Sequence, residues 1–218
     1  MPQPLIVNCS PRQGGNSAYA ADSIAKKLAD AVPPQGALTV LSLCDYTITP
    51  CIGCDICASP KSHRRFFLGC PLAPQDESEH VITALLQASS LYFVSPIYHY
   101  HLPAQAKALL DRLQPFFWMQ QQKVPYPSLL TPHIRYFPLF IAGQAQGKKL
   151  FEGSLLSLRY SFQSLGWQQG NWLGLRSIDE KDALRHNTEA QKNIEEYLMQ
   201  SLTPPEPVTS AFGPHGSL

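Results

Sequence analysis

Short apolar runs alternate with amphipathic helical patterns along most of the chain, and this alternation restricts the fold more than any other feature. Runs such as Leu5-Ile6-Val7 and Leu91-Tyr92-Phe93-Val94 are nearly continuous in apolar residues, which is typical of strands buried on both faces. Parallel strands need crossover connections, and helices on both faces of the sheet supply them. We therefore expect an α/β fold with a doubly wound, five-stranded parallel sheet. The expected strands lie within residues 5–9, 38–43, 91–94, 136–142 and 167–178, and the expected helices within residues 16–32, 77–88, 103–113, 148–165 and 183–198.

Length and charge bound the organisation and the partners of the protein. A chain of 218 residues fits one domain, which we expect over residues 1–202, followed by a proline-rich tail over residues 203–218. The 17 lysines and arginines nearly balance the 16 aspartates and glutamates, so charge gives no basis for binding nucleic acid or an anionic membrane. No apolar run approaches the roughly 20 residues of a membrane span, and the first residues lack the pattern of a signal peptide. We expect a cytoplasmic protein.

A polar, glycine-containing loop follows the first expected strand and leads directly into the first helix. It reads Ser10-Pro11-Arg12-Gln13-Gly14-Gly15-Asn16-Ser17. A dianionic phosphate needs short donors, a backbone free to curl around it, and the unpaired N–H groups and positive dipole end of a helix. Ser10, Asn16 and Ser17 would be the side-chain donors, and Arg12 the counter-charge. The loop therefore predicts a phosphate site; the alternative is an ordinary strand-to-helix turn capped by Asn16 or Ser17.

The position of this loop in the expected fold narrows the search for a site. Ligands of doubly wound sheets lie beyond the carboxyl ends of the strands, which points to the loops at residues 10–17, 95–101 and 142–147. Two other phosphate motifs are excluded. No Gly-x-Gly-x-x-Gly follows the first strand, and the segment from Gly143 to Lys149 is one residue short of a P-loop and lacks its Ser or Thr. The two histidines of the 95–101 loop lack nearby carboxylates, which disfavours a metal pair.

Three sequence motifs, taken in order, resemble those of a known family. They are the loop from Ser10 to Ser17, then Ser95-Pro96-Ile97-Tyr98, then the segment that runs from Leu102-Pro103-Ala104 to Asp111-Arg112. Together they resemble the NAD(P)H-dependent FMN reductase family of the flavodoxin superfamily, and most of all its iron–sulfur flavoprotein branch. The resemblance extends over roughly residues 5–200. It implies a flavodoxin-like sheet with the strand order 2-1-3-4-5.

The resemblance also implies FMN as cofactor and assigns residues to it. The phosphate would be held by Ser10, Arg12, Gly15, Asn16 and Ser17, and the flavin ring would lie along Pro96, Ile97, Tyr98 and His99. Ala142, Gly143 and Gln144 would meet the other edge of the ring. NAD(P)H is the implied electron donor, and a small molecule such as a flavin or quinone the acceptor. Because the cofactor carries the chemistry, no catalytic side chain is assigned.

The family also suggests partners of the protein's own kind. Its members are dimers or tetramers whose flavin sites are completed by a neighbouring subunit, so a homodimer or homotetramer is expected. A Gln- and Pro-rich insertion at residues 119–135 has no assignable secondary structure. Together with Phe116, Phe117, Trp118 and Tyr126 it is the expected subunit contact.

Four of the six cysteines lie close together in the sequence. Cys51, Cys54 and Cys57 are spaced two residues apart, and Cys70 is followed by a proline. This pattern resembles iron–sulfur ligation by four thiolates, although the interval from Cys57 to Cys70 is longer than the branch usually has. A [4Fe–4S] cluster, free thiols and a zinc site all stay open. The acidic segment Gln75-Asp76-Glu77-Ser78-Glu79 departs from the pattern of the relatives, and no role is carried over to it.

The cysteines also leave more than one function open. The main hypothesis is an FMN-dependent NAD(P)H oxidoreductase. The second is an iron–sulfur flavoprotein that carries electrons from ferredoxin through a [4Fe–4S] cluster to FMN. The third is a flavin-binding module without catalytic activity.

Overall fold

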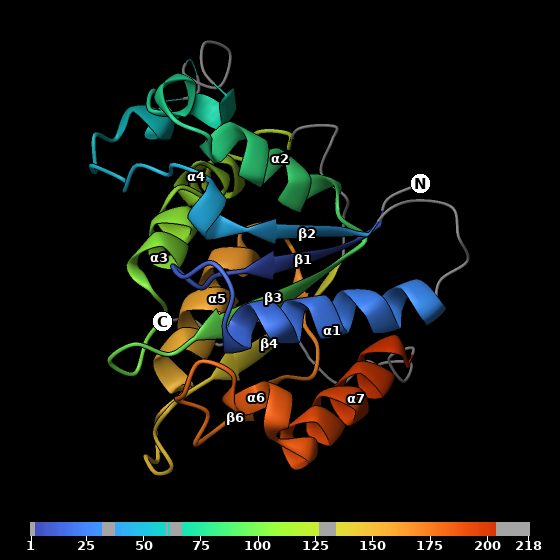
Figure 1. Ribbon diagram of the computed structural model, residues 1–218. Helices are drawn as coiled ribbons and strands as arrows, with labels where there is room; N and C mark the ends of the chain where they lie inside the picture. The colour runs from blue at the N-terminus through green and yellow to red at the C-terminus, as the bar shows by residue number, and fades with distance from the viewer. Residues whose placement is uncertain (1–2, 32–37, 60, 62–66, 127–133, 204–218) are drawn as a thin grey trace.

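The computed structural model describes residues 3–31, 38–59, 61, 67–126 and 134–203 (Figure 1). The predictions for residue 32, for residues 127–133 of the insertion and for residues 204–218 of the tail lie outside the described residues. Among the helices of the described part, none is long and apolar enough to cross a membrane.

A parallel sheet forms the centre of the molecule, as the alternating pattern predicts (Figure 1). Its order is β2-β1-β3-β4-β5, with β6 also paired to β4, and each pair of strands is parallel. The flavodoxin-like order is therefore confirmed. The strands are β1 (Pro4–Asn8), β2 (Thr39–Ser42), β3 (Ser90–Pro96), β4 (Arg135–Ile141), β5 (Gln168–Gln169) and β6 (Leu173–Leu175).

Helices cover both faces of the sheet, because successive residues of each buried strand point to opposite sides. In β1, Ile6 packs with α1, α6 and α7, whereas Leu5 and Val7 pack with α2, α3, α4 and α5. Ile6 pairs with Tyr92 across the sheet, and Tyr92 in turn stacks on Phe137 with ring centroids 5.1 Å apart. The helices are α1 (Asn16–Ala31), α2 (Ser78–Gln87), α3 (Ala104–Asp111), α4 (Gln114–Gln121), α5 (Glu152–Gln163), α6 (Ala183–His186) and α7 (Thr188–Leu202).

The last expected strand and the last expected helix are each split into two shorter elements. The fifth strand is interrupted between β5 and β6, where the Asn171 side chain donates a hydrogen bond to the Tyr197 carbonyl at 2.9 Å. The last helix is also two helices. Asn187 ends α6 and caps α7, since its side-chain oxygen accepts the Ala190 N–H at 2.9 Å.

Helix α4 occupies the start of the region that the sequence left unassigned, with Pro115 in its first turn. Pro115, Phe116 and Met119 pack inward, and Phe116 is fully buried in the core of the chain. The Tyr126 hydroxyl donates to the Ser164 carbonyl at 2.6 Å. The expectation that Phe116 contacts another subunit is therefore wrong, because its ring is already covered, whereas Phe117 is 40% exposed.

Candidate functional site

One pocket lies where the loops after β1, β3 and β4 meet, at the carboxyl edge of the sheet. This is the edge at which doubly wound sheets bind ligands. The pocket brings together nine of the residues expected from the sequence: Ser10, Arg12, Gly15, Asn16, Ser17, Pro96, Ile97, Tyr98 and Gly143. Their assignment to FMN stays a prediction, but their convergence on one cavity is a property of the fold.

The loop after β1 curls because of its own short hydrogen bonds and two glycines. The Asn8 side chain accepts the Ser10 N–H at 3.1 Å, and the Ser10 hydroxyl accepts the Arg12 N–H at 3.1 Å. Gly14 and Gly15 have φ angles of 78° and 84°, a left-handed conformation that glycine adopts without strain. Helix α1 starts immediately afterwards, so the free N–H groups of its first turn open on the pocket.

The side chain of Asn16 ties this loop to a distant part of the chain. Its amide nitrogen donates to the Glu180 carbonyl at 2.7 Å, and its oxygen accepts the Leu184 N–H at 2.9 Å. The residue predicted as a phosphate donor thus holds the segment that precedes α6 against the start of α1. Ser10 and Ser17, both buried, line the same pocket.

The loop after β3 forms a tight turn that places an apolar wall on the pocket. Tyr98 and His101 exchange two backbone hydrogen bonds of 2.9 Å, and the residues between them, His99 and Tyr100, have φ angles of 48° and 63°. These are the features of a type I′ turn, which usually contains glycine or asparagine. Pro96, Ile97 and Tyr98 line the pocket, whereas His99 does not.

The histidines of this turn do not form a pair. His101 is engaged elsewhere, because its Nε2 lies 3.0 Å from the Ser157 hydroxyl. No group of three or more His, Cys, Asp or Glu side chains among the described residues is spaced to hold a metal ion.

The loop after β4 is anchored by its backbone and contributes little side chain to the pocket. Ala142 donates its N–H to the Leu175 carbonyl at 2.9 Å, and its own carbonyl accepts the Ile178 N–H at 3.0 Å. Of the three residues expected at the ring edge, Gly143 lines the pocket, while Ala142 and Gln144 do not. The FMN contacts of Ala142 and Gln144 stay predictions.

Besides Gln13 and Gly14, which belong to the predicted phosphate loop, four residues that line the pocket were missed by sequence reasoning. They are Ile141, Ile178, Asp179 and Lys181. The last three follow β6, and the rule that ligands lie beyond the carboxyl ends of strands could have found them. The expected fifth strand spans residues 167–178, whereas β6 ends at Leu175. The sequence pattern therefore does not show where the loop after this strand begins.

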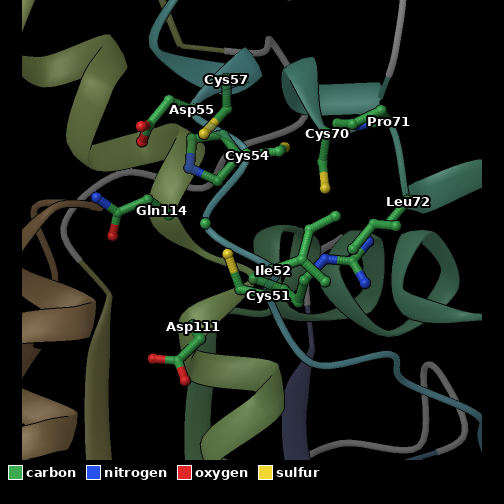
Figure 2. Close-up of a pocket in the computed structure, with 13 residues that line it drawn as sticks. Cys51, Ile52, Cys54, Asp55, Cys57, Cys70, Pro71, Leu72, Asp111 and Gln114 are labelled. Carbon is green, nitrogen blue, oxygen red and sulfur yellow. The ribbon is translucent and has the colours of Figure 1, made fainter.

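A second pocket is lined by all four clustered cysteines. Figure 2 shows the sulfur atoms of Cys51, Cys54, Cys57 and Cys70 arranged around a common space, with Pro71 at one side. All four cysteines are free of disulfide bonds. Burial, followed by the nearby Cys70, Cys51 and Cys54, raises the pKa of the Cys57 thiol to about 11. The four cysteines that the sequence pattern singles out therefore line one pocket.

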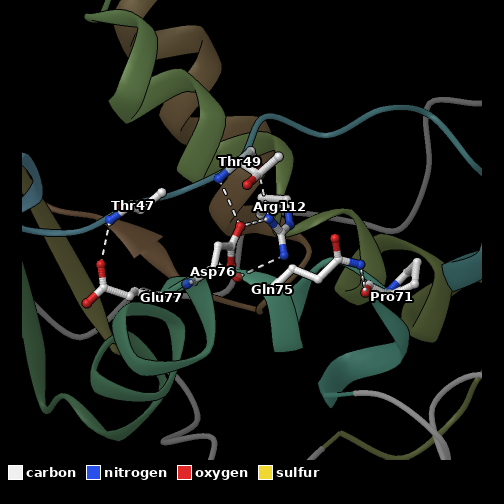
Figure 3. A network of polar contacts seen from close by, with 8 residues as sticks. Thr47, Thr49, Pro71, Gln75, Asp76, Glu77 and Arg112 are labelled. Carbon is white, nitrogen blue, oxygen red and sulfur yellow. Dashed lines mark hydrogen bonds and ion pairs between the residues drawn. The ribbon is translucent and has the colours of Figure 1, made fainter.

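A buried ion pair anchors the chain just before these cysteines (Figure 3). Arg112 Nη1 lies 2.6 Å from Asp76 Oδ2, with both side chains almost fully buried. The same guanidinium donates to the Thr49 carbonyl at 2.9 Å and to the Ser78 hydroxyl at 2.8 Å. Asp76 also accepts the Thr49 N–H at 2.8 Å. The acidic segment to which the sequence gave no role thus fixes the loop that enters the cysteine pocket.

Fold and site together define a class of protein. The sheet is doubly wound and parallel in this order, a polar, glycine-containing loop joins β1 to α1, and an apolar wall follows β3. These features are those of a flavodoxin-like protein. Residues 3–125, more than half of the chain, match the family model of NADPH-dependent FMN reductases. The chain belongs to the NADPH-dependent FMN reductase family, and the resemblance seen in the sequence is confirmed.

The chain is also similar to an individual curated protein over part of its length. Over 110 residues it is 28% identical to an iron–sulfur flavoprotein of Methanocaldococcus jannaschii, and the match spans 50% of each protein. The matched part is thus about half the length of that curated relative.

Two solved structures share the fold over nearly the whole chain. An NAD(P)H:quinone oxidoreductase from Methanothermobacter marburgensis is 14% identical with a TM-score of 0.63, and the alignment covers 94% of this chain and 98% of the other. An FMN-dependent NADH-azoreductase from Bacillus anthracis, in complex with FMN, is also 14% identical, with a TM-score of 0.59 and coverage of 93% and 100%. At these identities the likeness shows the fold alone.

Proposed function

We propose that the protein is an FMN-dependent oxidoreductase that accepts hydride from NAD(P)H and passes electrons to a small acceptor. The observation that carries the proposal is the pocket in which the β1 and β3 loops converge, both within the part that matches the family. Bound FMN would supply the chemistry, because it can accept hydride and pass on electrons. The residues present fit this cofactor in two respects, its phosphate and its ring.

The phosphate end of the pocket is built for an anion. Ser10 and Ser17 offer hydroxyl groups, Arg12 offers a guanidinium, and the first turn of α1 offers unpaired N–H groups. These groups would neutralise and orient the FMN phosphate. Because the N–H donors belong to a rigid helix end, their geometry is set before the cofactor arrives.

The part of the pocket that the ring would occupy is lined by more apolar residues. Pro96, Ile97 and Tyr98 line it from the β3 side, and Gly143 lines it from the β4 side. These residues would orient a planar ring and keep water from one of its faces. Tyr98 is 38% exposed, so the wall borders solvent, where a nicotinamide and an acceptor would reach the cofactor in turn.

The class of acceptor is the finer part of the proposal. The names of two structural neighbours describe quinone and azo compounds as substrates of those proteins. Both are planar conjugated molecules that would stack on an exposed flavin ring. We infer an acceptor of this shape, such as a flavin or a quinone. A homodimer or homotetramer is also part of the proposal.

Titration of the apoprotein with FMN, followed by quenching of flavin fluorescence, tests the cofactor site. We expect wild type to bind one FMN per chain, and Arg12→Ala to weaken binding about tenfold or more through loss of a charge-assisted hydrogen bond. Arg159→Ala removes an exposed arginine that does not line the pocket and should leave the affinity unchanged. Failure of wild type to bind FMN would overturn the proposal.

A second candidate function rests on the cysteine pocket. Four cysteines line one pocket, and the curated relative is an iron–sulfur flavoprotein. The chemistry of the donor set fits a [4Fe–4S] cluster, in which each thiolate binds a different iron. Four thiolates are also a donor set for zinc, and the described residues hold no group of three or more such side chains spaced for a metal ion of either kind. Cys51, Cys54, Cys57 and Cys70 would hold the cluster, and ferredoxin would then be a donor in place of NAD(P)H.

Iron and acid-labile sulfide analysis of anaerobically reconstituted protein tests this second candidate. We expect about four iron and four sulfide per chain, lost in Cys57→Ser and kept in Cys44→Ser, which changes a cysteine outside the pocket. Protein that binds FMN but retains no iron would restrict the cysteines to a thiol role and leave the reductase proposal in place.

A further inference from the structure

The segment that follows β6 lines the candidate FMN pocket with Ile178, Asp179 and Lys181. At its start, Ile178 is bonded to the β4 loop through its N–H and the Ala142 carbonyl, at 3.0 Å. At its end, Leu184 and Glu180 are bonded to Asn16 at the start of α1. The residues between these two anchors, Ile178 to Leu184, thus connect the ring end of the pocket to its phosphate end.

Two charged residues of this segment, Asp179 and Lys181, line the pocket. The Asp179 side chain lies beside the β4 loop, because a Cβ atom on Gly143 would stand 2.6 Å from its Oδ1. The backbone of Lys181 lies beside the phosphate loop, because a Cβ atom on Gly15 would stand 3.9 Å from its carbonyl oxygen. The two residues therefore lie beside different loops of the pocket.

The charges of the residues that line the pocket suggest a role for Lys181. Among the residues that line it, the cations are Arg12 and Lys181, and the carboxylate is Asp179. A phosphate monoester carries close to two negative charges at neutral pH. Arg12 alone would leave that charge only partly balanced, and the carboxylate of Asp179 lies on the Gly143 side of the pocket.

We propose that Lys181 is a second cationic contact of the FMN phosphate, delivered to the phosphate loop by the Asn16 tie, and that it selects FMN over riboflavin. The inference rests on the proposed FMN site. Lys181 itself is exposed, so its contribution is a salt-sensitive attraction to the phosphate. Riboflavin has the same ring and ribityl chain but no phosphate, and gains nothing from the ammonium group.

Titrations of the full chain with FMN and with riboflavin, at low and at high salt, test the proposal. We expect Lys181→Gln to weaken FMN binding about tenfold at low salt, to weaken it less at high salt, and to leave riboflavin binding unchanged. Lys181→Arg keeps the charge and should restore most of the FMN affinity. Lys192→Gln makes the same change of net charge on the exposed face of α7 and should alter neither affinity.

Asn16→Ala is a second variant, which would change the position of Lys181 and leave its charge in place. It removes both bonds to the 180–184 segment, so it should weaken FMN binding and also reduce the effect of a Lys181→Gln change made in the same chain. Additive effects of the two substitutions would contradict the delivery of Lys181 by Asn16.

The outcomes separate this proposal from the one on which it rests. Wild type that binds FMN, with Lys181→Gln unchanged in its FMN affinity, would overturn the role of Lys181 and leave the FMN site intact. Equal weakening of FMN and riboflavin would likewise overturn it, because the contact would then not be with the phosphate. Wild type that binds neither flavin would remove the proposed function itself.

Discussion

Asp76 and Arg112 show how strongly one buried pair can depend on pH (Figure 3). Burial alone would raise the pKa of Asp76, but hydrogen bonds from Ser78, Arg112 and Thr49 outweigh it and lower the pKa to about 2. In the unfolded chain the pKa of an aspartate is close to 4. The ionised carboxylate therefore stabilises the fold above that value, and the stabilisation is lost as the pH falls toward 2.

Chemical unfolding of wild type and Asp76→Asn across pH 2 to 5 measures this effect. Asp76→Asn should be less stable at pH 5, because it leaves the Arg112 charge buried without its partner. The difference between the two should shrink by about 2 kcal/mol as the pH falls to 2. Glu152→Gln, which breaks an exposed pair with Lys149, is the control and should show little such trend. A difference that stays constant with pH would contradict the account.

The sequence was enough to predict many of the residues that belong to the site, but not which residues they bond to. The close spacing of Cys51, Cys54 and Cys57 is local in the sequence, whereas Cys70, 13 positions further on, reaches the same pocket through the fold. The role of Asn16 was not visible, because its partners Glu180 and Leu184 lie more than 160 positions away. The role of Asp76 was not visible for the same reason: its partner Arg112 lies 36 positions away, just after α3.

Secondary-structure elements followed the sequence wherever periodicity was strong. The runs that became β1 and β3 and the apolar stripe of α1 were predicted in place, because both faces of the strands and one face of the helix are buried. Predictions were poorer where a capping residue or a short element decides the outcome. Asn187 divides α6 from α7, and β5 has only two residues, which is too short for a period to appear.

Helix α3 lies between the candidate FMN pocket and the cysteine pocket in the chain. Its first residue, Ala104, follows the loop that lines the candidate FMN pocket, and Asp111 at its end lines the cysteine pocket together with Arg112. A helix of eight residues is about 12 Å long. The C-terminal end of α3 thus borders the cysteine pocket, and its N-terminal end follows the loop whose residues Pro96, Ile97 and Tyr98 line the candidate FMN pocket. This arrangement suits electron transfer between the two pockets if the cysteines hold a cluster.

The central claim, that the protein moves electrons from a reduced nicotinamide to FMN, is tested most directly by anaerobic stopped-flow mixing. Protein loaded with FMN is mixed with NADPH or with NADH, and the visible absorbance of the flavin is followed. Dithionite, which reduces any accessible flavin, serves as the control. The account predicts that at least one nucleotide bleaches the bound flavin. Flavin that is bleached by dithionite and by neither nucleotide would contradict it.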